Sequence, residues 1–346
     1  MVIDLELEAA RHLLCERLLD YLNDLHPALR ADIVEVLSME GKLFHEPATR
    51  FDGRWALAPL YLARALHEEA DSAYSCAAAL AMECLICATD LLDDVMDEDM
   101  TPLIERLGIA RALNVALALL SLPQRILLAL ANRPPLSSLS VHLLDAVQRA
   151  LLLAVSGQQE DLLAEGCLAC ELREEGCIEI AAAKAGSLLG LACRQAALCA
   201  SVGEAPVERC AEMGRLLGIA AQLDNDAHDL ARLLESGSAG SRKSDLRRAK
   251  KTLPVVLAAR LLRETHGFEA REIDRVFQEL FSLSGEEQKM YFAALREGIL
   301  TTWGISLLYR ERARDCFNQM MGSGPVWETL LRVLGFEGSP AEMKDW

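Results

Sequence analysis

Two clusters of acidic residues, far apart along the chain, have the spacing to bind divalent cations. The first holds six carboxylates in ten positions, directly after an apolar run. On a helix, residues three or four apart share a face, so most of these side chains would project together. Oxygen ligands suit Mg²⁺, which keeps water ligands and binds phosphate oxygens, but a solvated acidic helix end would look the same. The side chains that would share the face are Asp90, Asp93, Asp94 and Asp97.

The second cluster extends from Gln222 to Asp229 and also follows an apolar helical run. Two such faces opposed across a helical bundle would hold several Mg²⁺ ions around a diphosphate. His228 falls off the shared face and is expected to be a solvated or capping side chain rather than a metal ligand. The oxygen-bearing side chains on that face are Gln222, Asn225, Asp226 and Asp229.

Basic residues that could contact a diphosphate lie in two places. An island from Arg242 to Lys251, which includes Lys243 and Lys250, stands out in an otherwise acidic protein. A flexible basic loop is the plainer interpretation of that island. Lys184 is surrounded by small apolar residues, where a charge facing the core needs a partner. It either extends along the surface to solvent or binds a phosphate group.

The sequence between these clusters predicts helices. Proline is absent from residues 136–205, 207–253 and 255–324, and no alternating strand pattern is visible in these windows. Breaks are expected at the Pro134-Pro135 pair, at 203–206, at 236–244 and at 322–325. We therefore expect an all-α protein with about ten or more helices in a single domain over residues 1–346.

Composition excludes several classes of protein. The net charge of −17 over 346 residues opposes binding to nucleic acid or to anionic lipid. No run approaches the ~20 uninterrupted apolar residues of a membrane span, so no integral membrane association is expected. Eleven cysteines and an N-terminus unlike a signal peptide predict reduced thiols in a cytoplasmic protein. Cys167, Cys170 and Cys177 are expected to be small buried thiols rather than a zinc site.

Taken together, these segments resemble the trans-type polyprenyl diphosphate synthases, which are helical class I isoprenoid synthases, over roughly residues 50 to 260. Asn225 replaces the first aspartate of the family's second aspartate-rich motif, and Ala249 replaces a glycine. The matching segments are Asp93 to Asp97 with DDxxD, Gly157 to Leu162 with GQxxDL, Lys184 to Gly186 with K-T-G, Gln222 to Asp229 with the second motif, and Asp245 to Pro254 with DLxxGKxTLP.

The resemblance implies a helical bundle around a central cavity in which an allylic diphosphate ionises, and it also implies a homodimer. About three Mg²⁺ ions would neutralise the charge that develops on the leaving group. Exclusion of water would protect the resulting cation. The implied metal ligands are Asp93, Asp97, Asn225, Asp226 and Asp229, with Asp94 beside them; the implied substrate contacts are Gln158, Asp161, Lys184, Gln222, Lys243 and Lys250.

Two departures from the family pattern concern the second substrate. Chain-elongating members carry a GKRxRP segment upstream and an RRG segment after the first motif, and both are expected to bind diphosphate. The candidate upstream segment, Gly53 to Pro59, has Trp and Ala in place of the basic residues, and only Arg106 follows the first motif closely. Without arginine side chains to pair with it, binding of a second diphosphate beside so many carboxylates is strongly unfavourable. Elongation with isopentenyl diphosphate is therefore expected to be lost.

Three functions remain open. The cation could react with its own distal double bonds, as in a terpene synthase, and this alternative is slightly favoured because it needs one substrate. A different acceptor could attack instead, as in the bacterial tryptophan prenyltransferases that modify a peptide. The chain could also be an inactive regulatory subunit of a prenyl synthase hetero-oligomer.

Residues one turn before the first motif bear on substrate length. Ala88 and Thr89 are small, and the resemblance implies room there for a C15–C20 or longer tail. Asp90 needs a proton, a metal or a partner, and could serve as a base. The rings that could stabilise a cation, although core packing is the more common role, are Trp55, Tyr61 and Tyr74.

Overall fold

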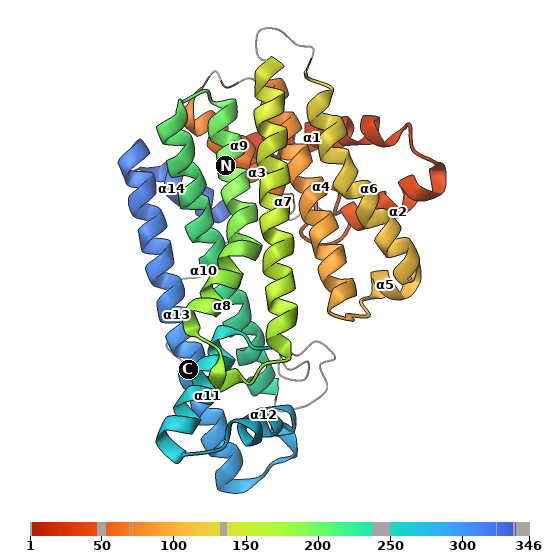
Figure 1. Cartoon of the computed structure of the whole chain (residues 1–346). Helices are drawn as coiled ribbons and strands as arrows, with labels where there is room; N and C mark the ends of the chain where they lie inside the picture. The colour runs from red at the N-terminus through yellow and green to blue at the C-terminus, as the bar shows by residue number, and fades with distance from the viewer. Residues whose placement is uncertain are drawn as a thin grey trace. The chain divides into compact units, whose positions relative to one another are not determined.

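The computed structural model describes residues 2–46, 53–68, 70, 72–131, 137–236, 250–322, 324–334 and 336, and every regular element in them is helical (Figure 1). The all-α prediction is confirmed. The helices are α1 Val2–Leu22, α2 Pro27–Leu37, α3 Arg54–Leu66, α4 Ser72–Met96, α5 Pro102–Leu107, α6 Ile109–Leu128, α7 Ser137–Glu165, η1 Ala169–Glu171, α8 Glu174–Ala181, η2 Ala182–Gly186, α9 Ser187–Cys199, α10 Glu204–Ser236, α11 Leu253–His266, α12 Ala270–Gln278, η3 Leu280–Ser282, α13 Gly285–Met321 and α14 Pro325–Leu334.

The predicted helix breaks match the structure where it is described. Helix α9 ends at Cys199 and α10 begins at Glu204, while α13 ends at Met321 and α14 begins at Pro325. Proline at the first position of α14 is favourable because its missing N–H would be unpaired there anyway. Helix α10 is described as far as Ser236, and the rest of the predicted break at 236–244 lies outside the described residues. The Pro134-Pro135 pair lies outside the described residues.

The chain forms two compact units that are interleaved in sequence. Unit 1 comprises Met1–Gln148, Leu191–Ala211 and Phe317–Trp346, and unit 2 comprises Arg149–Gly190 and Glu212–Cys316. Helices α7, α9, α10 and α13 each begin in one unit and end in the other. The single-domain organisation stays a prediction, and each unit is described by itself.

Helix α4 is the core helix of unit 1. It packs against α6 and α3, and its residues from Ser75 to Ala88 are buried. Its interior is rich in Ala, Leu, Cys and Met, which fit a helix surrounded by other elements. Continuous burial ends at Ala88, and of the residues from Thr89 to Met96 only Leu91 is buried, so the acidic residues lie at the more exposed end of the helix.

Unit 2 brings α8, α10 and α11 together around a small apolar cluster, which consists of Cys177, Ala181, Ile219, Leu223, Leu253 and Val256. Between α8 and α9 the chain makes one π-helical turn, η2, that contains Lys184. Gly157 of α7 lets this turn come close, since a Cβ there would lie 2.6 Å from the Ala183 Cβ and 3.0 Å from the Lys184 backbone nitrogen. Gly218 of α10 is in close contact with the Ala185 backbone. Two glycines therefore make room for the turn.

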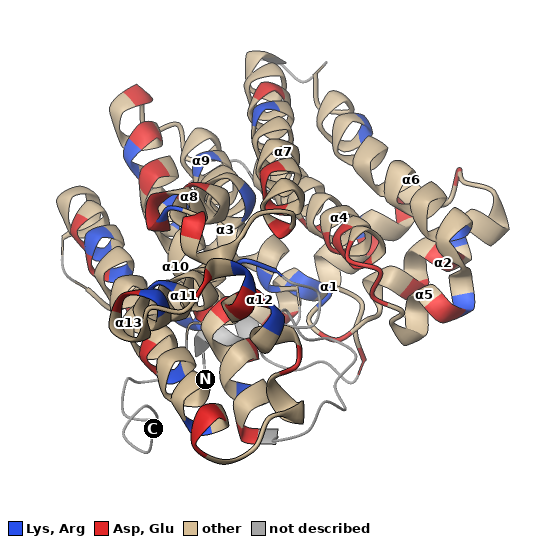
Figure 2. Ribbon diagram, turned by 60° about the horizontal axis from the view of Figure 1, so that its bottom comes forward, with Lys and Arg blue, Asp and Glu red and all other residues tan. Residues whose placement is uncertain are grey.

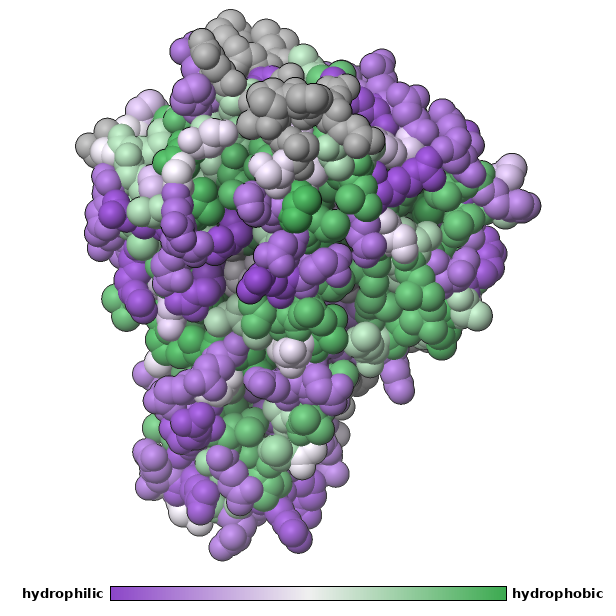
Figure 3. All heavy atoms as spheres, turned by 45° about the horizontal axis from the view of Figure 1, so that its top comes forward, coloured by the Kyte–Doolittle hydropathy of each residue, from purple (hydrophilic) through white to green (hydrophobic). Residues whose placement is uncertain are grey.

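Several helices are strongly apolar. By length and composition alone, four described stretches are long and apolar enough to cross a membrane: Ala73–Met96, Ile109–Leu128, Ser138–Glu165 and Glu174–Cys199. In the first, 83% of the most apolar window is buried within the protein, as expected for a core helix. In the second and third stretches, 44% and 39% of the most apolar window is buried. Figure 3 shows apolar patches on one face of the molecule.

No disulfide joins any of the eleven cysteines, all of which lie in described residues. Most are buried, including Cys170 and Cys177, whereas Cys167 is exposed. The burial of Cys170 and Cys177 agrees with the prediction of small buried thiols, whereas the exposure of Cys167 does not.

Candidate active site

The first acidic cluster lies at the C-terminal end of α4, where acidic residues gather in Figure 2. Asp93, Asp94 and Asp97 are half-buried. The helix ends tightly, since the Asp97 N–H donates to the Asp93 carbonyl at 2.8 Å and Glu98 adopts a positive φ of 53°. A left-handed non-glycine residue costs about 1 kcal/mol and is common at functional sites.

The position of this cluster puts carboxylates at the negative end of a helix dipole. The C-terminus of a helix carries a partial negative charge, which disfavours carboxylates there. The last turn of α4 contains no basic residue. Asp93, Asp94 and Asp97 therefore add like charge to the negative end of a helix, and a bound divalent cation would remove that cost.

A loop before α3 contacts α4 at Asp90, the first residue of the first cluster. Lys42 forms an ion pair with Asp90, and the Lys42 side chain is only 12% exposed. Burial opposes its charge, but the Asp90 carboxylate holds the pKa of Lys42 above its ordinary value. Beneath the loop, fully buried Glu83 accepts a 2.8 Å hydrogen bond from the Leu43 N–H, and burial raises the pKa of Glu83. Asp90 thus has the partner that the sequence required.

The second acidic cluster lies on α10 in unit 2. The Gln222 side-chain amide donates to Asp226 at 2.9 Å, and Asp229 accepts from Arg232 at 2.8 Å. Asn225 and Asp229 are exposed, whereas Gln222 and Asp226 are half-buried. The shared face expected from the sequence is therefore present, with its oxygens near the surface of the unit.

The opposite face of α10 is anchored to α13. Buried Asp224 forms an ion pair with Arg310, and Ser306 donates to the Ala220 carbonyl at 3.1 Å. His228 is exposed, with its Nδ1 2.7 Å from the Asp224 carbonyl oxygen and its ring 5.2 Å from that of Trp303. His228 is off the face of the acidic oxygens, as predicted. These contacts fix the rotation of α10 about its axis.

Lys184 is paired. Its Nζ lies 2.6 Å from Asp161 Oδ2, and the two side chains are 17% and 19% exposed. The π turn carries Lys184, and α7 carries Asp161 and the adjacent Gln158. Both polar atoms of the Gln158 amide are buried without a hydrogen-bond partner among the described residues. A buried amide with no partner is unfavourable, so a ligand or ordered water at Gln158 would satisfy it.

Several predicted residues of unit 2 converge near Cys177. Burial, followed by the negative charges of Asp226 and Asp161, raises the pKa of Cys177 to about 12. Cys177 itself packs against Ile219 and Leu223 of α10 in the apolar cluster of unit 2. The Cys177 thiol is also 3.6 Å from the Lys251 carbonyl oxygen, which puts the segment before α11 in the same place.

That segment is held by a buried ion pair. Lys251 lies 2.9 Å from Asp274 of α12, and the two side chains are 5% and 12% exposed. Asp274 also accepts from the Ala169 N–H at 3.2 Å. Lys250, next in the chain, is half-buried. Lys243 lies outside the described residues.

The remaining predicted residues belong to unit 1. Ala88 is fully buried, and the hydroxyl of half-buried Thr89 donates to the Ile86 carbonyl at 3.1 Å. Tyr74 is a core residue that donates to the Leu130 carbonyl at 3.2 Å. Trp55 and Tyr61 are half-buried in α3.

Sequence reasoning missed four residues that hold these groups in place: Lys42, Glu83, Asp274 and Arg310. A signal was available for one of them. Gly41-Lys42 matches the first two residues of the GKRxRP segment better than Gly53-Arg54 does. Leu43 and His45 stand at the positions of the two arginines, and Pro47 follows shortly after. The structure supports that choice because Lys42 contacts α4 at Asp90.

The donor set fits magnesium. The side chains on both acidic faces offer carboxylate and amide oxygens, which Mg²⁺ prefers over sulfur or imidazole ligands. Among the described residues, no group of three His, Cys, Asp or Glu side chains is close enough to hold a metal ion by itself. Mg²⁺ is commonly bound through one or two carboxylates together with water and substrate phosphates, so the two observations agree.

The fold defines the class of protein. Solved structures with the helical fold of the isoprenyl diphosphate synthases superpose on nearly the whole chain. A geranylgeranyl pyrophosphate synthetase from the archaeon Geoglobus acetivorans has a TM-score of 0.72 at 22% identity, covering 95% of this chain and 96% of its own. A polyprenyl synthetase from Streptomyces coelicolor has a TM-score of 0.69 at 20% identity, with 95% and 97% covered.

The chain belongs to the polyprenyl synthetase family, whose model matches residues 54–284. This confirms the resemblance found in the sequence. It is also similar to the tryptophan prenyltransferase ComQ of Bacillus spizizenii, with 29% identity over 184 residues. That match covers 53% of this chain and spans 58% of the length of ComQ.

Proposed function

We propose that this protein ionises an allylic prenyl diphosphate and transfers the prenyl group to an acceptor other than isopentenyl diphosphate, with a peptide tryptophan as the leading acceptor. The observation that carries the ionisation step is that the η2 turn, which carries Lys184 paired with Asp161, packs against α10 at Gly218, one helical turn before Gln222. The choice of acceptor is supported by the similarity to a tryptophan prenyltransferase. The slight preference for cyclisation expressed from the sequence is therefore reversed.

Each group has a separate role in the proposed mechanism. Lys184, oriented by Asp161, and Lys250 would bind diphosphate oxygens as cations. Gln222, oriented by Asp226, would contact the same diphosphate. Mg²⁺, when bound, would neutralise charge on the leaving group. The residues that would hold it, about three ions in all, are Asp93, Asp97, Asn225, Asp226 and Asp229.

Ionisation needs a site in which the leaving group is stabilised and the cation is kept from water. Positively charged groups aimed at a leaving diphosphate act most strongly where solvent is excluded. The Lys184 and Asp161 side chains are mostly buried, so the pair meets that requirement. Small, buried Ala88 supports a C15–C20 or longer prenyl tail.

Cyclisation is the second candidate because the sequence lacks most basic residues of the co-substrate segments. A terpene synthase needs no acceptor at all. An inactive regulatory subunit would need neither an acceptor nor the ionising residues.

Release of inorganic diphosphate separates these functions. The full-length protein would be incubated with Mg²⁺ and geranyl, farnesyl or geranylgeranyl diphosphate, with and without a tryptophan-containing peptide. We expect release, and a prenylated peptide by mass spectrometry, only when both substrates are present. Release without a peptide would support the cyclase, and no release with any chain length or acceptor would support the inactive subunit.

Two variants test the metal ligands in the same assay. Asp229→Asn and Asp93→Asn should each lower turnover by about 100-fold or more, because each removes a charged metal ligand. Glu286→Gln, at the exposed start of α13, removes a similar charge from an ion pair and should leave turnover unchanged. Equal activity of Asp229→Asn and Glu286→Gln would contradict the proposed role of α10.

A further inference from the structure

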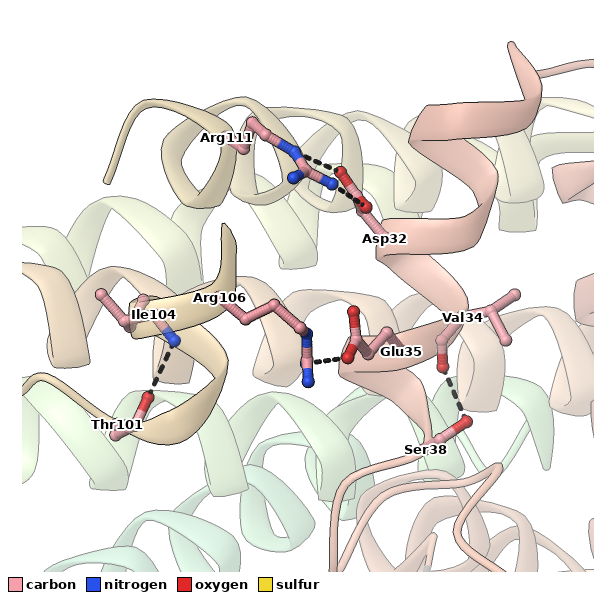
Figure 4. Close-up of polar contacts among 8 residues, drawn as sticks. All are labelled: Asp32, Val34, Glu35, Ser38, Thr101, Ile104, Arg106 and Arg111. Carbon is pink, nitrogen blue, oxygen red and sulfur yellow. Dashed lines mark hydrogen bonds and ion pairs between the residues drawn. The ribbon is translucent and has the colours of Figure 1, made fainter. Parts of the chain in front are cut away.

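Three basic side chains near the first acidic cluster are each held by a carboxylate of unit 1. Lys42 pairs with Asp90, one helical turn ahead of Asp93. Figure 4 shows the other two, Arg106 of α5 with Glu35 and Arg111 of α6 with Asp32, where both carboxylates come from α2. Thr101 caps α5 and thereby fixes the helix that presents Arg106.

Lys42 and Arg106 lie at the two ends of the first acidic cluster. Lys42 pairs with the first carboxylate of the cluster, and Arg106 is in the short helix that follows the cluster. Among the described residues of unit 1, both are therefore cations placed to meet an anion that approaches the first acidic cluster. Both are already engaged by the protein itself.

A paired cation attracts a third charge much less than a single cation does. The field of a contact ion pair is that of a dipole, which falls off faster with distance than the field of one charge. The effect is stronger for Lys42, whose side chain is 12% exposed, than for Arg106, which is 55% exposed and better screened by solvent. Asp90 thus cancels the more effective of the two cations.

The carboxylates of this cluster that neither Mg²⁺ nor Lys42 neutralises also oppose a diphosphate brought to this region. Six carboxylates lie within ten residues at the end of α4. A second diphosphate would add two or three negative charges, in addition to those of the allylic substrate. An uncharged acceptor meets no such repulsion.

We infer that Asp90 and Glu35 are specificity-determining residues, which pair with Lys42 and Arg106 and so prevent a second diphosphate from binding to unit 1. The acceptor is thereby restricted to an uncharged nucleophile. This inference rests on the proposed function, since it concerns the acceptor of the same reaction. The indole ring of a tryptophan side chain is one such nucleophile. Isopentenyl diphosphate is excluded by its charge.

The test measures binding of isopentenyl diphosphate to the full-length protein. Asp90→Asn and Glu35→Gln remove the charges while keeping an oxygen that accepts from Lys42 or Arg106. The matched control is Asp24→Asn, which removes the same charge from the exposed Arg125–Asp24 pair in the same unit. Binding would be followed by calorimetry with Mg²⁺ and a saturating, non-ionisable thiolo analogue of the allylic substrate, so that only a second diphosphate is detected.

We expect Asp90→Asn to tighten binding about 10- to 100-fold, as for a newly available hydrogen bond to a charged group, and Glu35→Gln to tighten it less. The double variant should bind tightest, and Asp24→Asn should match the wild type. Wild-type affinity equal to that of the double variant would overturn the inference, as would an equal gain in Asp24→Asn.

Failure of this inference is distinguishable from failure of the proposed function. Diphosphate release from the allylic substrate with a peptide acceptor tests the function, whereas the affinity series tests only the two pairs. If Asp90→Asn were to unfold, as judged by circular dichroism, Glu35→Gln would decide the matter alone. A gain in Glu35→Gln over Asp24→Asn would then support the inference, and equal affinities would overturn it.

Discussion

Lys184 shows how one side chain can link backbone geometry to chemistry. The π turn, the Asp161 carboxylate and the glycine of α7 all constrain it. π-Helical turns are rare and occur mostly at functional sites. A lysine that is 17% exposed and held at 2.6 Å from its partner loses little freedom on binding a phosphate, because its position is already set.

Loss of the Lys184 charge should therefore lower turnover rather than only stability. We expect Lys184→Gln to reduce kcat/KM for the allylic diphosphate about 10- to 100-fold, the range for one charge-assisted hydrogen bond. Asp161→Asn should have a smaller effect because the cation remains. Steady-state measurement of diphosphate release checks both variants.

The matched control is the exposed Lys289–Glu286 pair in the same unit, at 2.7 Å. Lys289→Gln removes an equivalent charge from a pair that solvent screens. Equal turnover of the Lys184→Gln and Lys289→Gln proteins would show that Lys184 does not contact the substrate.

At the scale of elements, close approach between helices positions the residues of unit 2. Gly157→Ala should destabilise the protein by about 1 to 3 kcal/mol, because the new Cβ would overlap the η2 backbone and the turn must shift. Gly176→Ala in α8, which has no atoms within 4 Å of the added Cβ, should instead stabilise by about 0.5 to 1 kcal/mol. Urea unfolding of both variants measures this contrast, and equal shifts would contradict the packing argument.

The contact between α9 and α10 in unit 1 predicts a pH dependence. Arg194 donates two hydrogen bonds of 2.6 Å to Glu208, and this interaction lowers the pKa of Glu208 below its ordinary value of 4.5. A lowered pKa means that the stabilisation is present above pH 4.5 and is lost as the pH falls through the folded-state value. The pair is partly exposed, so its contribution is at most about 1 kcal/mol.

The measurement is urea unfolding of wild type and Glu208→Gln at pH 7 and at pH 3. Wild type should be the more stable protein at pH 7, and the difference should be smaller at pH 3. A difference that is independent of pH would mean that packing, rather than charge, accounts for the effect of the substitution.

The sequence predicted the elements well and their contacts poorly, for a physical reason. Helix breaks and the shared faces of α4 and α10 follow from local periodicity, so they could be predicted. The Lys42–Asp90 and Lys251–Asp274 pairs join residues that are brought together by folding. Only long-range packing determines them. The η2 turn depends likewise on glycines of two other helices.

At the scale of the whole molecule, α6 predicts self-association. Ile109, Leu113, Leu117 and Leu128 are between 38% and 63% exposed on this helix, whose inner side packs on α4. Apolar residues left on one helix in this way favour a partner surface. We expect a homodimer in solution, in which Leu117→Asp becomes monomeric without loss of helicity. Light scattering after gel filtration measures the mass.

Leu308→Asp on α13 is the control, because that leucine is 65% exposed on a different helix. It should leave the dimer intact. A monomeric wild type at micromolar concentration, or dissociation by both substitutions alike, would show that α6 is not the association surface.

The distribution of thiols has a practical consequence. Burial raises the pKa of Cys84 and Cys193 well above the ordinary value, and a thiol reacts as its thiolate. Cys167, just after α7, is exposed. A maleimide fluorophore should consequently attach first at Cys167, giving a reporter a few residues from Asp161 without any engineered cysteine.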